Sequence, residues 1–314
     1  MEVSVVIPNF NGIAFLDSVL GSLEGQTLKN FEVILVDNGS ADGSCSFVSA
    51  NYPWVHIIEL PDNFGFCRAV NEGIKAAKAP YVLLLNNDTE VKEDFVEQML
   101  LAIRRHKNAF SCAARMVQYH DRDKLDDAGN YYCALGWSFA RGKGKNFEKE
   151  QKIFTACAGA AIYRKKIFEK IGYFDEEHFA YLEDTDIGYR ARIYGYENWY
   201  APDAVVYHVG SGTSGSRYNH FKTRYSSRNN IYLIYKNMPL LQIILNLPFL
   251  VAGFLIKFLF FALKGMGKEY LAGIKNGFSI SMNHRKVPFS VKHLPNYCKI
   301  QLELWENMFR RIRA

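Results

Sequence analysis

A short apolar segment runs directly into two amides and a carboxylate in the stretch Tyr81-Val82-Leu83-Leu84-Leu85-Asn86-Asn87-Asp88-Thr89-Glu90. An apolar run of this length without alternation is typical of a strand covered on both faces in a parallel sheet. Ligands of such sheets bind beyond the carboxyl ends of the strands. The stretch therefore predicts a buried strand that delivers Asn86, Asn87 and Asp88 to a binding site.

Similar apolar, β-branched runs alternate with helical patterns through the first 116 residues. We expect the other strands at Val3–Ile7, Phe31–Val36, Val55–Leu60 and Ala109–Met116, and helices at Ile13–Leu23, Gly43–Ala50, Arg68–Lys78 and Lys92–His106. This order predicts an α/β fold with a mostly parallel sheet flanked by helices. The strand-end rule adds Pro8–Asn11 and Asp37–Ser40 to the predicted site.

Residues 117–150 are polar and rich in glycine, which predicts a long excursion over the site that acts as a lid or an acceptor-binding insert. Regular structure is expected again in four segments: strands at Phe154–Tyr163 and Ala204–Tyr207, and helices at Lys165–Ile171 and Asp184–Tyr194. The sequence shows no internal repeat.

Charge is distributed unevenly along this chain of 314 residues, which is 49% hydrophobic and carries a net charge of +6. Residues 265–314 hold nine Lys or Arg and three Asp or Glu, whereas the rest of the chain holds 29 of each sign. A nucleic-acid enzyme more often spreads basic charge over its main domain, so we expect no nucleic-acid partner. A basic tail beside an apolar segment instead favours an anionic membrane surface as a partner.

The apolar segment is Leu240–Leu263, which is interrupted by Gln242, Asn246, Pro248 and Lys257. A spanning helix needs about 20 clean apolar residues, and a single span would carry the basic tail to the outside. Helices lying in the membrane interface are therefore favoured, with a true span and a buried core or dimer contact as the alternatives. The final segment Ile300–Ile312 spaces Leu302, Trp305, Phe309 and Ile312 like a surface-bound amphipathic helix.

The cysteines and the N-terminus indicate where the chain works. The six cysteines form no CxxC pair, which favours reduced, mostly buried thiols in a cytosolic protein. The segment Met1–Pro8 lacks the basic and apolar regions of a secretory signal. We expect the N-terminal domain at the cytoplasmic face of the inner membrane, held there by peripheral or in-plane helices.

Two carboxylates follow predicted strands. Asp37 precedes an Asn-Gly-Ser turn and is suited to accept a hydrogen bond from a base or ribose, although a turn or helix-capping role competes with this reading. Asp88 is suited to Mg²⁺ or Mn²⁺, which prefer oxygen ligands and often use one carboxylate together with substrate phosphates. Capping of the next helix is the alternative role for Asp88.

Two further motifs carry titratable groups. Tyr181–Asp186 places three carboxylates within four residues, of which Asp184 is suited to act as a general base and Asp186 to pair with Arg190 and Arg192. His208 ends a predicted strand and is suited to bind a divalent ion together with Asp88. The run Gly210–Gly215 matches GxGxxG, but no apolar helix follows it directly and no acidic residue lies about 20 positions further on. A dinucleotide site is therefore rejected in favour of a loop that closes on a diphosphate.

Six motifs in this order resemble the family 2 glycosyltransferases, which have the GT-A fold. They are Val5–Asn11, Asp37, Asn63–Phe66 with Asn71, Asn86–Asp88, Ala158–Ala160 with Gly172–Glu176, and Glu183–Asp184 with His208. The resemblance covers about residues 3–235 and implies a catalytic domain at 1–235, with a nucleotide-sugar half at 1–116 and an acceptor half at 117–235. Residues 236–314 then form a helical, membrane-associating extension.

The resemblance also implies a role for each matched residue. It implies donor binding by Pro8, Phe10, Asn11, Asp37, Asn63, Gly65, Arg68, Asn86 and Asn87, metal binding by Asp88 and His208, acceptor-side roles for Gly159 and Glu183, and a catalytic base at Asp184. The sequence departs from the family pattern at Asn86, where an acidic residue is usual, and at Val70, where many relatives have Arg. The Asn-Asn-Asp-Thr run resembles the branch that contains rhamnosyltransferases.

The implied reaction is an inverting transfer of a sugar from a nucleotide-diphosphate donor, dTDP-rhamnose or a UDP-sugar, with Mg²⁺ or Mn²⁺. The expected acceptor is a saccharide used in cell-surface polysaccharide synthesis. Because the C-terminus is apolar and basic and is expected to face a membrane, we expect this saccharide to be lipid-linked. A sugar nucleotidyltransferase is an alternative, but Pro8–Gly12 lacks the basic, glycine-rich loop that it needs. A non-catalytic scaffold docked on membranes is the other alternative, against which the set of Asp88, Asp184 and His208 argues.

Overall fold

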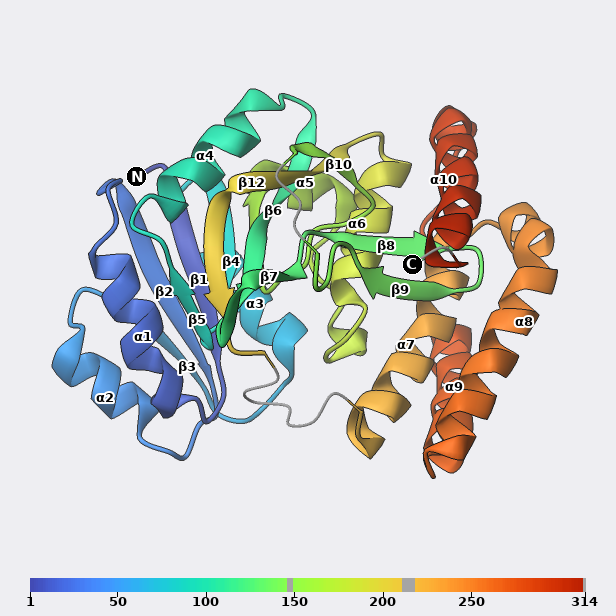
Figure 1. The fold of residues 1–314 in the computed structure, drawn as a ribbon, viewed down its shortest axis with the longest axis horizontal. Coiled ribbons are helices and arrows are strands. Elements are labelled where there is room, and N and C mark those ends of the chain that lie inside the picture. Colours follow the sequence, from blue (N-terminus) through green and yellow to red (C-terminus); the bar gives the residue numbers. More distant parts are fainter. Residues whose placement is uncertain (146–148, 211–217, 313–314) are drawn as a thin grey trace.

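The computed structural model describes residues 1–145, 149–210 and 218–312. A mixed α/β body holds a central sheet, and four C-terminal helices stand together at one side of it (Figure 1). The first half of the body contains β1 (Val3–Asn9), α1 (Ile13–Glu24), β2 (Phe31–Asn38), α2 (Ser44–Asn51), β3 (His56–Leu60), α3 (Phe66–Ala76) and β4 (Tyr81–Leu85). Every strand and helix expected in this half is present, with ends shifted by at most two residues.

The four strands of this half are parallel, in the order β3-β2-β1-β4. Alternate side chains of the strands enter two hydrophobic cores, one on each face of the sheet. Helices α1, α2 and α4 (Phe95–Arg105) cover one face, and α3, α5 (Lys165–Ile171) and α6 (Glu183–Ile193) cover the other. This double cover is the reason that the strands read as continuous apolar runs.

The second half of the sheet continues from β4 through β11 (Ala160–Arg164), β6 (Ala109–Gln118), β12 (Glu197–His208) and β10 (Gln151–Ile153). The strand expected at Phe154–Tyr163 is wrong over its first six residues, because β11 begins only at Ala160; Cys157, Ala158 and Gly159 border a cleft instead. The strand expected at Ala204–Tyr207 begins at Glu197 instead. A register shift between Ala201 and Val205, around Pro202, hides its first part from the sequence pattern.

The polar stretch 117–150 is largely ordered as strands, contrary to the expected irregular excursion. It forms β7 (Asp121–Asp127), which pairs with β6, and a separate hairpin of β8 (Asn130–Cys133) and β9 (Trp137–Ala140). A short strand, β5 (Thr89–Val91), pairs with β12. Residues 146–148 of the stretch lie outside the described part of the chain.

The C-terminal helices are α7 (His220–Asn237), α8 (Leu240–Leu263), α9 (Gly267–Asn283) and α10 (Leu294–Ile312). Two short 3-10 helices are also described: η1 (Glu176–His178), which precedes α6, and η2 (Val291–His293), which precedes α10. Gly273 and Gly277 let α9 lie directly on α7, because a Cβ at either position would fall 1.9 Å from Ser227 Oγ or 2.6 Å from the carbonyl oxygen of Arg228. Helix α10 packs on β8 and α6, where the amide of Ala134 donates to the carbonyl of Leu304 at 3.0 Å.

Helix α8 is continuous from Leu240 to Leu263, and the polar residues that interrupt its apolar pattern do not break it. Gln242 and Asn246 are buried against the protein, where Tyr189 donates to Gln242 at 2.8 Å and Asn246 exchanges two hydrogen bonds with Gln301. The helix also continues through Pro248. Among the described residues, α8 is the one helix long and apolar enough to cross a membrane, and 17% of its most apolar window is buried.

Helix α10 divides its apolar residues between two faces. Ile300 and Leu304 are buried against the body, whereas Leu302 and Phe309 of the predicted amphipathic stripe are exposed. Trp305, the third residue of that stripe, lies between the two sets and donates to Asn246 of α8 at 3.1 Å. The stripe is therefore only partly free to meet another surface.

Candidate active site

A cleft of about 870 Å³ lies beyond the carboxyl ends of β1, β2 and β4. Its second wall is formed by β9, by residues 179–184 and by the start of α7. Eleven of the predicted site residues line it: Pro8, Phe10, Asn63, Gly65, Asn86, Asn87, Asp88, Gly159, Glu183, Asp184 and His208. Segments far apart in the sequence therefore meet at the edge of the sheet that the strand-end rule indicated.

A chain of buried amides ties three strand ends together below this cleft. Asn87 donates to Asn9 at 2.7 Å, and Asn9 donates in turn to Asp37 at 2.9 Å. The second oxygen of Asp37 accepts from the amide of Ser40 at 2.9 Å. Asp37 does not line the cleft itself, but it fixes the turn that follows β2.

Asn11 also lies behind the cleft lining rather than in it. Its backbone amide donates to Ser40 Oγ at 2.8 Å, and its side-chain oxygen accepts from the backbone amide of Ala41 at 2.9 Å. Asn11 holds a positive φ of 47°, a conformation that asparagine tolerates better than most residues. Asn11 therefore joins the loops after β1 and β2.

Arg68 and Asn71 on α3 are not brought to the cleft. Arg68 forms ion pairs with Glu72 and Glu176 and its side chain is 43% exposed. Asn71 is buried and exchanges hydrogen bonds with the backbone of Phe174 at 2.8 and 3.0 Å. Asn71 thus joins α3 to the segment before α6, and Arg68 is not among the residues that line the cleft.

Asp88 and His208 face each other across the cleft floor. Asp88 Oδ1 lies 3.3 Å from His208 Nε2, and His208 Nδ1 lies 2.8 Å from Asp126 Oδ2. Burial alone would lower the pKa of His208, but its hydrogen bonds to Asp126 and Asp88 raise that pKa to about 9. This part of the cleft therefore favours a positive charge between two carboxylates.

These groups fit a divalent cation. Two ligands of an octahedral Mg²⁺, each about 2.1 Å from the ion, lie roughly 3 Å apart, close to the separation of Asp88 and His208. Asp126 supplies the carboxylate that commonly orients a metal-binding histidine. No group of three or more His, Cys, Asp or Glu side chains suited to a metal occurs in the described residues, so substrate phosphates must complete such a site.

Three further carboxylates, those of Asp127, Glu183 and Asp184, also line the cleft. Asp184 accepts from Asn130 at 2.9 Å and from the amide of Thr185 at 2.6 Å, and burial raises the pKa of both Asp184 and Glu183. Burial and the nearby Asp184 raise the pKa of Asp127 to about 7. A carboxylate with a raised pKa is a stronger proton acceptor when ionised, as a general base requires.

Asp186 has a different environment from Asp184, although both belong to one motif. It is fully buried and accepts hydrogen bonds from Arg190, Lys236 and Asn237 at 2.7–3.0 Å. Burial opposes its ionisation, but Arg190 and Lys236 hold its pKa well below the usual range. Asp186 is therefore structural, as predicted, whereas Arg192 contacts Glu303 of α10 instead of this cluster.

The segment just before Glu183 is strained. Phe179, Tyr181 and Leu182 all have positive φ values of 58–72°, which are uncommon for non-glycine residues. The side-chain amide of Asn229 holds the segment by donating to the carbonyls of His178, Ala180 and Tyr181, each at 2.8 Å.

Gly65 permits the close approach of this strained segment to the start of α3. A Cβ at Gly65 would lie 2.5 Å from the Phe179 ring and 2.7 Å from its carbonyl oxygen. Gly65 also has a φ of 86°, which favours glycine. The glycine therefore brings the donor side of the cleft against the segment that leads to Asp184.

Sequence reasoning missed Asn9, Asp126, Asp127, Asn130 and Asn229. Asn9 stood inside a predicted motif, so its strand-end position was a usable signal. The acidic pair lies in a polar stretch that was interpreted as a surface excursion, and Asn229 lies in a helix with no distinguishing spacing. The GxGxxG run also remains open, because residues 211–217 lie outside the described residues.

The sequence model for Glycosyl transferase family 2 matches residues 4–172, more than half of the chain. The chain belongs to glycosyl transferase family 2. The family expected from the six motifs is thereby confirmed, and the protein is a glycosyltransferase.

One relative of this glycosyltransferase is an N-acetylglucosaminyl-diphospho-decaprenol L-rhamnosyltransferase from Mycobacterium tuberculosis. It is 26% identical over 237 residues, which cover 67% of this chain and 77% of the relative. A likeness to this protein agrees with the expected rhamnosyltransferase-like branch.

Solved structures confirm the GT-A fold. The structure of GalNAc-T7 with UDP, GalNAc and Mn²⁺ matches with a TM-score of 0.60 at 15% identity, over 74% of this chain and 47% of that protein. Residues 1–349 of Staphylococcus aureus TarS, in complex with UDP, match with a TM-score of 0.54 at 17% identity, over 95% of this chain and 78% of that one. At these identities the match concerns the fold alone.

Replacing Asn229 with Ala tests how the strained segment supports this glycosyltransferase. One buried and two partly buried carbonyls lose their donor, so we expect the free energy of unfolding to fall by about 1–3 kcal/mol. Release of the segment displaces Asp184, and a shift of about 1 Å can lower kcat roughly 10²-fold. Urea unfolding and the rate of sugar transfer give the two readouts. The matched control is Asn283→Ala, an exposed amide on α9, and equal rates for both variants would contradict this role.

Proposed function

We propose that the protein is an inverting transferase that moves a sugar from a nucleotide-diphosphate donor to a saccharide acceptor by a single displacement. One observation supports this most strongly: the Asp88–His208 pair and the Asp184 carboxylate line the same cleft. The first suits the leaving diphosphate and the second suits the attacking hydroxyl. Inversion follows when the two act on opposite sides of one anomeric carbon.

The donor lies along the ends of β1, β2 and β4. Phe10 offers an aromatic face near the cleft opening, and the turn fixed by Asp37 receives the base and ribose. Asn86 and Asn87, directly before Asp88, provide amides for the sugar hydroxyls. Either dTDP-rhamnose or a UDP-sugar suits this arrangement, and the likeness to a rhamnosyltransferase favours the first.

Asp88 and His208 hold Mg²⁺ or Mn²⁺ in this proposal, with Asp126 orienting the histidine. When bound, the ion would neutralise the negative charge that develops on the leaving diphosphate. Asp88 also anchors the loop after β12, since its carbonyl accepts from the amide of Val209 at 3.0 Å. The metal-binding side chain and the loop that follows His208 are therefore fixed together.

Asp184 removes the proton from the acceptor hydroxyl as that oxygen bonds to the anomeric carbon. The bond from the anomeric carbon to the diphosphate oxygen breaks, and the nucleoside diphosphate leaves with the electron pair. Asn130 and Thr185 hold the Asp184 carboxylate in position by hydrogen bonds. Glu183, beside it in the cleft wall, faces the acceptor.

The acceptor is a lipid-linked saccharide in this proposal, and residues 236–314 keep the enzyme at the cytoplasmic face of the membrane. The exposed side chains of α8 are almost all apolar, and no Asp or Glu occurs between residues 204 and 268. A basic and apolar surface of this kind suits anionic lipids. The relative from Mycobacterium tuberculosis is named for a decaprenol-linked acceptor, which supports the same class.

Replacing Asp184 with Asn tests the base. The variant keeps the size of the side chain, but it replaces one acceptor oxygen by an amide donor and loses the proton acceptor. We therefore expect turnover to fall roughly 10²–10⁴-fold. Donor affinity, measured by calorimetry, should stay close to that of the wild type. The matched variant Asp127→Asn should lose much less activity. The assignment is wrong if Asp184→Asn turns over normally, or if Asp127→Asn is the more damaged variant.

Replacing Asp88 with Ala tests the metal site. We expect Mn²⁺ to strengthen donor binding in the wild type and to have little effect on this variant. Asp126→Asn should weaken Mn²⁺ affinity about 10–100-fold, as loss of an orienting partner commonly does. Asp121→Asn, an exposed carboxylate on the same strand, serves as the control. Donor affinity that is equal with Mn²⁺ and with a chelator in the wild type would refute the site.

A further inference from the structure

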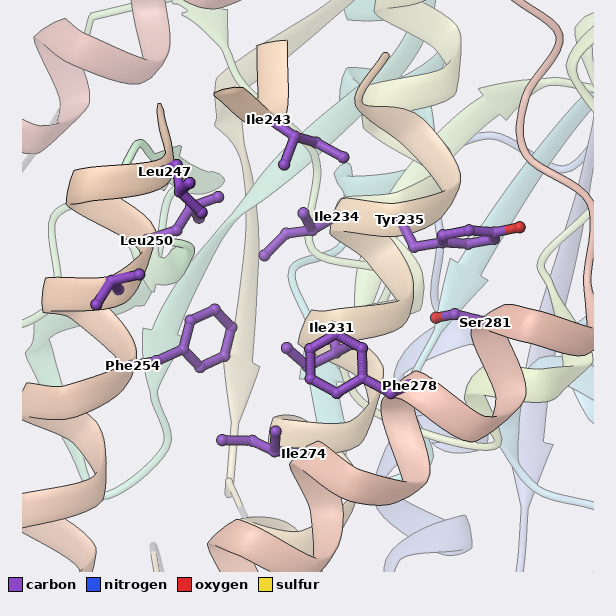
Figure 2. A pocket seen from close by; sticks show the side chains of 11 residues that line it. Ile231, Ile234, Tyr235, Ile243, Leu247, Leu250, Phe254, Ile274, Phe278 and Ser281 are labelled. Carbon is purple, nitrogen blue, oxygen red and sulfur yellow. The ribbon is translucent and has the colours of Figure 1, made fainter. Parts of the chain in front are cut away.

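A second cavity, of about 440 Å³, lies away from the cleft, between α7, α8 and α9 (Figure 2). Figure 2 shows Ile231 and Ile234 of α7, Leu250 and Phe254 of α8, and Phe278 of α9 directed into the same space. Its size falls within the range of pockets that bind small molecules. The reaction proposed for sugar transfer does not use this cavity.

The side chains that line the cavity do not need a hydrogen bond from an occupant. Tyr235 donates its hydroxyl to the carbonyl of His284 at 3.1 Å, and Ser281 donates to the carbonyl of Gly277 at 2.7 Å. All other lining side chains are hydrocarbon. Both hydroxyls are thus used within the protein, and the pocket selects a ligand by apolar contact alone.

The pocket opens onto an exposed apolar surface. Its own lining residues Leu247, Val251 and Phe278 are 51–58% exposed. On α8 they continue into exposed residues outside the pocket, such as Leu255 and Leu259. A hydrophobic chain can therefore enter from an apolar phase without crossing a polar rim.

Helix α7 connects the pocket with the catalytic cleft. Its residues Phe221, Lys222 and Ser226 line the cleft, and Ile231 is the first to line the pocket. Five residues of α-helix span only about 7.5 Å along the axis. The β8–β9 hairpin makes the same connection, because Ser138 lines the cleft while Gly136 lies against Leu250 and Ile234.

The first half of α7, between the two sites, is basic, although Glu177 lies near Arg228 and Glu269 of α9 pairs with His220 at 3.3 Å. Lys222, Arg224 and Arg228 follow one another along α7, and the helix carries no acidic residue. Arg224 and Arg228 share a stripe with Ile231 at helical spacing, and side chains on a helix lean toward its N-terminus, here the cleft end. A diphosphate placed between an apolar chain and a sugar would meet this stretch.

We propose that the pocket between α7, α8 and α9 binds the hydrocarbon chain of the lipid-linked acceptor, whose diphosphate lies along the first half of α7 and whose sugar reaches Asp184. This inference rests on the proposed function, because it assigns a place to the acceptor of that reaction. It makes the enzyme selective for the length of the lipid chain as well as for the saccharide.

The test compares two acceptors with the same saccharide diphosphate, one on a chain of twenty carbons and one on a chain of five, in detergent with saturating donor. We expect the wild type to have a KM about tenfold lower or more for the long chain, the effect of burying roughly two further methylene groups. Val251→Trp fills the pocket mouth and should remove this preference. Leu255→Trp, equally exposed one turn further along α8 and outside the pocket, should retain it.

Equal KM values for both chains in the wild type, with transfer intact, would overturn the pocket and leave the proposed function standing. Absence of transfer to either acceptor, in a protein that binds donor, would overturn both. A second readout avoids catalysis: an isoprenyl diphosphate with a photoreactive group at its far end should label peptides 231–235 and 274–281. Labelling spread along the outer face of α8, or cross-linking of two copies of the chain, would overturn the pocket.

Discussion

The position of the cleft wall that carries Asp184 depends on one buried charge, the carboxylate of Asp186. Arg190 from its own helix and Lys236 with Asn237 from α7 surround it, and removing one partner of such a buried pair commonly costs about 3–5 kcal/mol. Asp184 and Asp186 lie two positions apart in α6, a spacing that separates side chains by roughly 200° around a helix axis. Because Asp186 is anchored inward, Asp184 points outward into the cleft. One short acidic motif therefore supplies both an anchor and a reactive group, and α7 is bound to the catalytic body by the same contact.

The other wall is rigid for a different reason. The amide chain Asn87–Asn9–Asp37 joins three parallel strand ends whose backbones are already fixed by the sheet. The strained segment of residues 179–182 is part of the second wall and is held by Asn229 from α7. Helix α7 thus supports the base, closes one side of the cleft and forms a wall of the apolar pocket, which couples the acceptor side of the enzyme to its C-terminal helices.

Much of this organisation was predictable where local pattern and burial agree. The parallel strands gave continuous apolar runs because both sheet faces are covered, and their ends located Pro8, Phe10, Asn86, Asn87 and Asp88 in the cleft. The other predicted cleft residues came from the remaining motifs and the family resemblance. The pattern failed where tertiary partners decide the structure. Gln242 and Asn246 look like interruptions of α8, but both are satisfied by side chains of α6 and α10. Asp126 and Asp127 look like surface charges, yet β7 places the first on His208 and buries the second beside Asp184, a proximity that only the pairing of β7 with β6 creates.

The central claim is that the cleft binds a nucleotide-diphosphate sugar through a divalent metal. Its most direct measurement is a thermal-shift screen of the detergent-purified protein against UDP-, dTDP- and GDP-sugars, each with Mn²⁺ and with a chelator. A ligand at about 100 times its Kd stabilises a protein by about 2.7 kcal/mol, which such a screen detects. The account predicts stabilisation by one nucleotide class only, and only with Mn²⁺. No shift with any donor, or the same shift with the chelator, would contradict it.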